Sequence, residues 1–170
     1  VNTPMGITRI IREELDETHK YFIAEMGAYG PGSIERLCKL CPPDFGLITA
    51  IGHAHYERFK TLETVAEAKY ELAHAAIKRD GKVIVHEKTL RFPYTQDVRT
   101  ENDTSFIVCG NDEKDDLYIE HTEQTTQGLF IRLHWKGEKY DLEVPLFGLH
   151  HADNVALAFV TACTLNINPE

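Results

Sequence analysis

The segment from Leu62 to Ile77 constrains the fold of this chain most, because its apolar residues recur at helical spacing. The residues of this stripe are Leu62, Val65, Leu72 and Ala76, and the position that completes it is Lys69. A buried ammonium group is costly unless it is paired, deprotonated or chemically changed. We therefore predict an amphipathic helix over 62–77 that carries Lys69 into a polar site.

Around this helix, the first half of the chain alternates apolar strands with helices. We predict helices over Pro4–Glu14 and 34–40, the second with Ser33 as its N-cap, and strands over Tyr21–Met26, Phe45–Ile51 and 83–86. This β-α-β-α-β order implies a parallel sheet flanked by helices, which is an α/β fold. Ligands of such sheets bind beyond the carboxyl ends of the strands.

The second half of the chain has a different pattern. Strands are predicted over 105–110, 116–123, 128–135 and 139–147, with a hairpin turn around Gly137, and His150–Leu165 closes the chain as an apolar helix. We expect a smaller, mostly antiparallel sheet here. The chain then divides into a parallel α/β part (1–90), a smaller β-sheet part (91–147) and a closing helix (148–170).

Candidate site residues follow the predicted strands. Glu25 lies at the end of one strand, and His53 and His55 lie just beyond the next. The topology is expected to bring them together with Lys69. Each residue also has an ordinary interpretation: Glu25 as an exposed strand end, the histidines as surface residues, and Lys69 as a side chain that reaches out to solvent.

Composition limits the classes of function. With 170 residues, 42% of them hydrophobic, the chain suits one soluble domain with a substantial core. Its net charge of -9 argues against nucleic acid as a partner. We see no membrane helix, no signal peptide and no G-x-x-x-x-G-K-S/T phosphate loop. Cys38 and Cys41 fit ordinary reduced thiols, so we expect a cytoplasmic protein.

Three stretches, EMGAYGPGSI, GLITAIGHAHYERFKTLETVAEAKYEL and PLFGLHHADNVALAFVTA, occur in the order and spacing of the central ATPase domain of Mur ligases. The chain resembles this family over nearly its whole length, and is most similar to the branch that adds D-alanyl-D-alanine. The resemblance implies that Glu25 and His55 bind Mg²⁺ and that Lys69 is carbamylated and supports the metal. It also implies that His150, His151 and Asn154 bind ATP, and that Asn2 and Thr3 contact substrate.

The reaction implied by the resemblance is ATP-dependent amide-bond formation in the synthesis of cell-wall peptidoglycan precursors. ATP phosphorylates a carboxylate of a UDP-linked muramyl peptide, and the amine of D-alanyl-D-alanine attacks the acyl phosphate. The family's first strand and phosphate loop are expected upstream of Val1, and its C-terminal domain beyond Glu170. We interpret the chain as a fragment that is inactive by itself. We expect it to dimerise through the sheet edge that the missing first strand leaves unpaired.

Several positions depart from the family pattern. Ala50 and His151 replace asparagines, and 86–88 reads H-E-K where the family has N-x-D. They bear on the adenine contacts and on the exact substrate. Three alternatives to this interpretation stay open: a related ligase with another acceptor, a metal-dependent hydrolase built on Glu25, His53 and His55, or a non-catalytic binding domain.

Overall fold

The computed structural model describes residues 2–52 and 59–167, and its centre is one six-stranded mixed sheet. In spatial and chain order the strands are β1 (Phe45–Ile48), β2 (Lys82–His86), β3 (Phe106–Gly110), β4 (Leu117–Gln124), β5 (Leu129–Trp135) and β6 (Glu138–Val144). Neighbours from β1 to β4 are parallel, and β4, β5 and β6 pair in antiparallel fashion. The α/β fold class is thereby confirmed.

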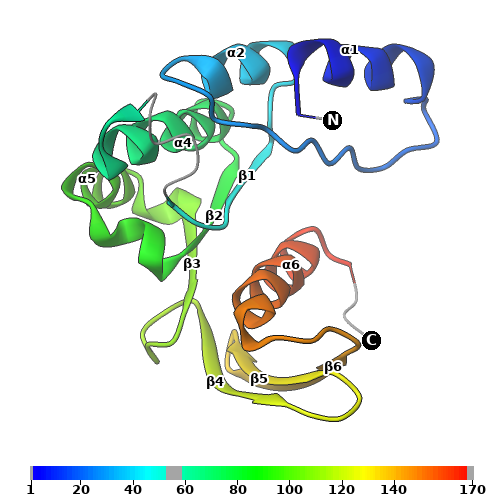
Figure 1. Ribbon diagram of the computed structural model, residues 1–170, viewed down its shortest axis with the longest axis vertical. Coiled ribbons are helices and arrows are strands. Elements are labelled where there is room, and N and C mark those ends of the chain that lie inside the picture. The colour runs from blue at the N-terminus through cyan, green and yellow to red at the C-terminus, as the bar shows by residue number, and fades with distance from the viewer. Residues whose placement is uncertain (1, 53–58, 168–170) are drawn as a thin grey trace.

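The described helices are α1 (Pro4–Glu13), α2 (Ser33–Leu40), α4 (Leu62–Ile77), α5 (Pro93–Glu101) and α6 (Ala152–Thr164), with short 3₁₀ turns over Glu87–Arg91, Asp103–Ser105 and Leu149–His151. Helix α2 packs on α4, and α1 packs on α2 (Figure 1). Helices α4 and α5 lie on one face, and α6 lies on the other (Figure 1). Among the described residues, no helix is long and apolar enough to cross a membrane.

Strand β2 separates two hydrophobic cores. Val83 and Val85 point into the core beneath α4 and α5, whereas Ile84 points into the core beneath α6. This arrangement follows from the alternation of side chains along a strand. Because both faces of β2 are covered, its central residues 83–85 are all apolar.

The predicted helix over 62–77 is confirmed as α4. Thr61 caps it, since its hydroxyl accepts a hydrogen bond from the Thr64 N–H. The predicted hairpin between β5 and β6 is also present. Its two turn residues, Lys136 and Gly137, both have positive φ angles of 52° and 82°, as a tight two-residue hairpin turn requires.

The predicted strand over Tyr21–Met26 is wrong: this segment has no strand pairing. It does keep the side-chain alternation of a strand, because Phe22, Ala24 and Met26 pack against a third cluster, formed by α1 and α2, while the residues between them are exposed. Side-chain alternation needs only one apolar surface, but a ladder of backbone hydrogen bonds needs a neighbouring strand.

Other differences are local. Gly32, not Ser33, is the N-cap of α2, and its φ of 79° suits glycine. Helix α5 was not predicted, β1 ends at Ile48, and the closing helix begins at Ala152 after a 3₁₀ turn. The two expected sheets are one, because β3 and β4 pair directly at two positions, Cys109 with Leu117 and Gly110 with Tyr118.

Candidate functional site

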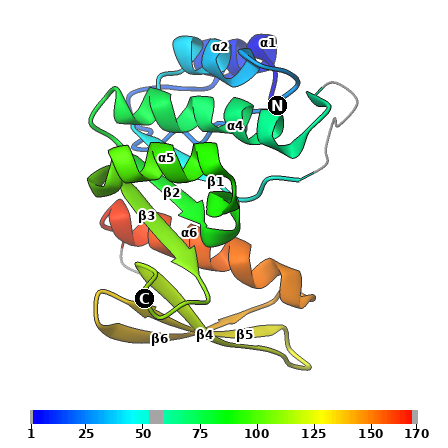
Figure 2. The same cartoon turned by 90° about the vertical axis from the view of Figure 1, so that its left-hand side faces the viewer.

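The predicted site residues that the structure describes gather in part at the carboxyl ends of the parallel strands. Figure 2 shows the start of α4 and the start of α6 on the same side of the molecule, the side toward which β2 points. This is the edge where sheets of this type bind ligands. Lys69 belongs to α4, whereas His150, His151 and Asn154 lie at the start of α6.

Lys69 reaches the end of β1. Its Nζ donates a hydrogen bond of 2.5 Å to the backbone carbonyl of Ala50, two residues after the strand. The side chain is half-buried, and this burial lowers the pKa of the Lys69 amine. A lowered pKa favours the neutral amine, which is the nucleophilic form that reacts with carbon dioxide.

Glu25 is exposed on the coil that precedes α2. His53 and His55, the other predicted metal ligands, lie outside the described residues. Within the described parts of the chain, no group of three or more histidine, cysteine, aspartate or glutamate side chains could hold a metal ion. In the sequence, His53 and His55 follow three and five positions after Ala50, the residue that Lys69 contacts.

The predicted ATP-binding residues surround the start of α6. His150 and Asn154 are exposed, His151 is half-buried, and the two imidazole rings lie 4.1 Å apart between centroids. A side chain of β4 holds the turn before them in place: the Gly148 N–H donates a 2.6 Å hydrogen bond to Oε1 of Gln124. Backbone N–H groups at the start of a helix attract anions such as phosphates.

Beside these residues lies a cluster that joins His86 and Lys88, two residues of the H-E-K departure from the family pattern, to Asp153. His86 is the last residue of β2, and its side chain is buried. Its Nε2 lies 3.3 Å from Oδ1 of Asp153 in the first turn of α6. The other oxygen of Asp153 accepts a 2.8 Å hydrogen bond from Lys88. The sequence marked 86–88 as a departure from the family pattern but did not indicate Asp153, because Lys88 and Asp153 are distant in sequence.

Asn2 and Thr3, the predicted substrate-binding residues, lie at the start of α1. The Thr3 hydroxyl caps this helix by accepting a hydrogen bond from the Gly6 N–H. Asn2 lines a hollow of about 410 Å³ formed with the glycine-rich loop 27–33, and Tyr29 donates a 3.2 Å hydrogen bond to its Oδ1. Asn2 therefore has a cavity beside it, and the side chain of Thr3 has a structural role.

Glu71 of α4 holds the same glycine-rich loop in place. One of its carboxylate oxygens accepts a hydrogen bond from the Gly32 N–H at 2.5 Å, and the other accepts one from the Glu35 N–H at 2.8 Å. The carboxylate satisfies two amides that the start of α2 leaves without helical partners. The conformation of this loop thus depends on a residue far away in the sequence.

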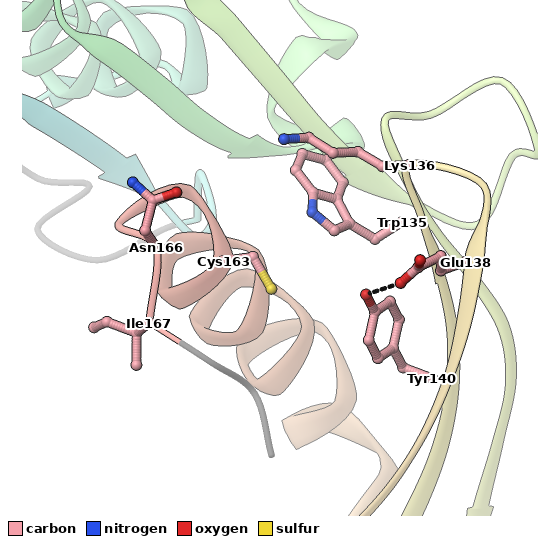
Figure 3. Close-up of a pocket in the computed structure, with 7 residues that line it drawn as sticks. All are labelled: Trp135, Lys136, Glu138, Tyr140, Cys163, Asn166 and Ile167. Carbon is pink, nitrogen blue, oxygen red and sulfur yellow. Dashed lines mark hydrogen bonds between the residues drawn. The ribbon is translucent and has the colours of Figure 1, made fainter.

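A second hollow, of about 440 Å³, lies between the β5–β6 hairpin and the end of α6 (Figure 3). Trp135, Lys136 and Tyr140 line it from the hairpin, and Cys163 lines it from α6. None of the predicted site residues is among its lining residues. It is therefore separate from the candidate site.

Comparison with known proteins connects this geometry to a family. The profile of the Mur ligase middle domain matches residues 1–162. A curated relative from Buchnera aphidicola, named UDP-N-acetylmuramoyl-tripeptide--D-alanyl-D-alanine ligase, is 28% identical over 155 residues, which are 90% of this chain and 33% of the relative. The chain thus spans about a third of the length of this relative.

Solved structures show the same fold. MurF from Acinetobacter baumannii superposes with a TM-score of 0.84 at 24% identity, over 99% of this chain and 36% of that one. MurF ligase from Thermotoga maritima, solved in complex with ADP, gives a TM-score of 0.73 at 22% identity, over 89% of this chain and 36% of that one. Since the family profile covers nearly all of the chain, this protein belongs to the Mur ligase middle-domain family.

Proposed function

We propose that the chain is the ATP-binding central domain of an amide ligase that adds D-alanyl-D-alanine to a UDP-linked muramyl peptide. The single observation that carries the proposal is the placement of Lys69, whose half-buried amine faces the end of β1. Family membership and the name of the Buchnera relative support the reaction class and the acceptor. Such a ligase of peptidoglycan precursor synthesis acts in the cytoplasm.

Lys69 fits the role of a metal-supporting carbamate. A neutral lysine amine that adds carbon dioxide and releases a proton becomes an anionic carbamate, whose oxygens suit a hard cation such as Mg²⁺. The carbamate would lie near the loop that carries His55, and Glu25 would complete the set of ligands. When bound, Mg²⁺ neutralises negative charge on the transferring phosphoryl group.

The start of α6 would hold the nucleotide. His150, His151 and Asn154 offer hydrogen-bonding groups there, beside the backbone N–H groups of the first turn. In the proposed reaction, ATP phosphorylates the carboxylate of the muramyl peptide, and the amine of D-alanyl-D-alanine displaces phosphate from the acyl phosphate. Asn2, beside the hollow at the glycine-rich loop, would contact the peptide substrate.

The test is ligase activity of the full-length protein with Lys69→Ala. We expect loss of most activity, and partial rescue by a small carboxylate that fills the space of the carbamate. Lys78→Ala, at the exposed end of the same helix, is the matched control and should keep wild-type activity. Wild-type activity of Lys69→Ala, or ATP-independent hydrolysis by the wild-type protein, would refute the proposed function.

We also propose that the isolated 170-residue chain dimerises through β1. This strand is at one end of the sheet, and Phe45 and Leu47 are 37% and 40% exposed. An unpaired edge strand with exposed apolar side chains favours pairing with another chain. Light scattering at high protein concentration should show a dimer, and a strictly monomeric species would contradict this proposal.

A further inference from the structure

His86 is 1% exposed and ends β2 on the face that α6 covers. Its Nδ1 accepts a 3.2 Å hydrogen bond from the backbone N–H of Lys88. We therefore assign the proton of the neutral ring to Nε2. This N–H lies 3.3 Å from Oδ1 of Asp153 but makes no well-aligned hydrogen bond. A buried donor thus faces a carboxylate in the first turn of α6.

Asp153 links this buried ring to an exposed cation. Its Oδ2 accepts the 2.8 Å hydrogen bond from Nζ of Lys88, and its side chain is 33% exposed. The neighbouring residue is Asn154, and His151 lies two positions earlier. The cluster therefore joins the end of β2, the 3₁₀ turn after it and the start of α6.

The surroundings keep the ring of His86 neutral. Burial lowers the pKa of His86; Lys88 lowers it further, and the carboxylates of Asp153 and Glu87 oppose the shift. On β3, the residue in register with His86 is Cys109, whose buried thiol has a raised pKa and stays uncharged. Protonation of His86 would also place two donors, Nδ1–H and the Lys88 N–H, against each other.

We infer that His86 is a positioning residue for nucleotide binding: with Asp153 and Lys88, its neutral ring fixes the start of α6 that presents His151 and Asn154. This inference rests on the proposed function, and it assigns a role to three residues that need not touch the nucleotide. A side chain that sets the orientation of a binding segment contributes to affinity by lowering the cost of ordering that segment.

The test uses the full-length protein, calorimetric titration with magnesium and ADP, and steady-state kinetics with ATP. We expect His86→Ala and Asp153→Asn each to weaken ADP binding on the order of tenfold, and to raise KM for ATP with little change in kcat. His86→Gln should restore most of the affinity, because its amide can replace the Nε2–H donor. Asp97→Asn, exposed on α5, is the control and should bind ADP like the wild type.

The outcomes separate the two proposals. No ADP binding by the wild-type protein would refute the proposed function and, with it, this inference. Wild-type affinity in both His86→Ala and Asp153→Asn would overturn the inference alone. If His86→Ala does not fold, Asp153→Asn decides, because it keeps the size of a side chain that is partly exposed.

Discussion

The parallel region, β1–β3 with α4 and α5, and the antiparallel region, β4–β6 with α6, share one sheet but are specified differently. In the antiparallel region each strand pairs with the next along the chain. In the parallel region each pair of strands is separated by a helix. Local sequence therefore sets register in the antiparallel region, whereas distant contacts set it in the parallel region.

Strand β5 shows the local case. Its burial alternates without a break from Leu129 to Trp135, and its partner β6 follows after a two-residue turn. Segment 21–26 shows the opposite case, because it has the same alternation and no strand pairing. Alternation along the chain thus predicts which side chains are buried more reliably than it predicts a paired strand.

We expect the largest effect on stability when a leucine of a central strand is replaced, and a much smaller one for a leucine of the edge strand β1. Leu133 on β5 is fully buried, whereas Leu47 on β1 is 40% exposed. Leu133→Ala should lower the free energy of unfolding by about 2–5 kcal/mol, and Leu47→Ala by less than about 1 kcal/mol. Urea unfolding of the monomeric protein, at a concentration too low for the proposed dimer, measures both. Equal losses would mean that the side chain of Leu47 is covered in the monomer.

The hairpin turn gives the next effect. Gly137 has a φ of 82° and no atom near the position of an added Cβ, so Gly137→Ala should cost about 1–2 kcal/mol through backbone strain alone. Gly30→Ala is the control, since this position also has open space but no positive φ. Thermal unfolding should separate the two variants. The turn would not set the register if Gly137→Ala were as stable as Gly30→Ala.

On the side of the parallel region, the contact to compare with the hairpin turn is the capping of α2 by Glu71, a residue distant in sequence. Glu71→Gln should destabilise the protein by about 1 kcal/mol, because an amide replaces one of the two acceptor oxygens. Glu67→Gln, an exposed change four residues earlier on α4, should have little effect. Hydrogen exchange of the Gly32 and Glu35 amides reports the cap directly. Unchanged exchange in Glu71→Gln would contradict the role assigned to this carboxylate.

A smaller effect concerns His86, which joins the two regions. Its folded-state pKa is lowered, chiefly by burial, so the unfolded chain binds more protons between that pKa and about 6.5. Stability should therefore fall as the pH drops below about 6.5, and His86→Gln should lose this part of the pH dependence. Urea midpoints at several pH values measure it, with the exposed His121→Gln as control. If the wild type and both variants lost the same stability at low pH, this would contradict the burial of a neutral His86 ring.

The smallest effect compares two surface ion pairs. Arg132 and Asp141 join β5 to β6 through two hydrogen bonds of 2.8 Å, one to each carboxylate oxygen. Arg79 contacts only one oxygen of Asp44, and both side chains are more exposed. Double-mutant cycles should give a coupling energy below about 1 kcal/mol for each pair, and the larger value for Arg132 and Asp141. A larger value for Arg79 and Asp44 would reverse the comparison.

The sequence by itself determined the elements whose signals are local. The helix over 62–77 carries its own cap, Thr61, and its own apolar spacing. The β5–β6 hairpin carries its own turn. The motifs also identified the family, because they preserve both order and spacing along most of the chain.

Only the tertiary structure decided the contacts between distant segments. It directed the amine of Lys69 to the carbonyl of Ala50, brought Asp153 to His86, and left segment 21–26 without a strand partner. The physical reason is that hydrogen bonds, ion pairs and desolvation depend on which surfaces meet, and a periodic pattern along one segment does not specify its partner.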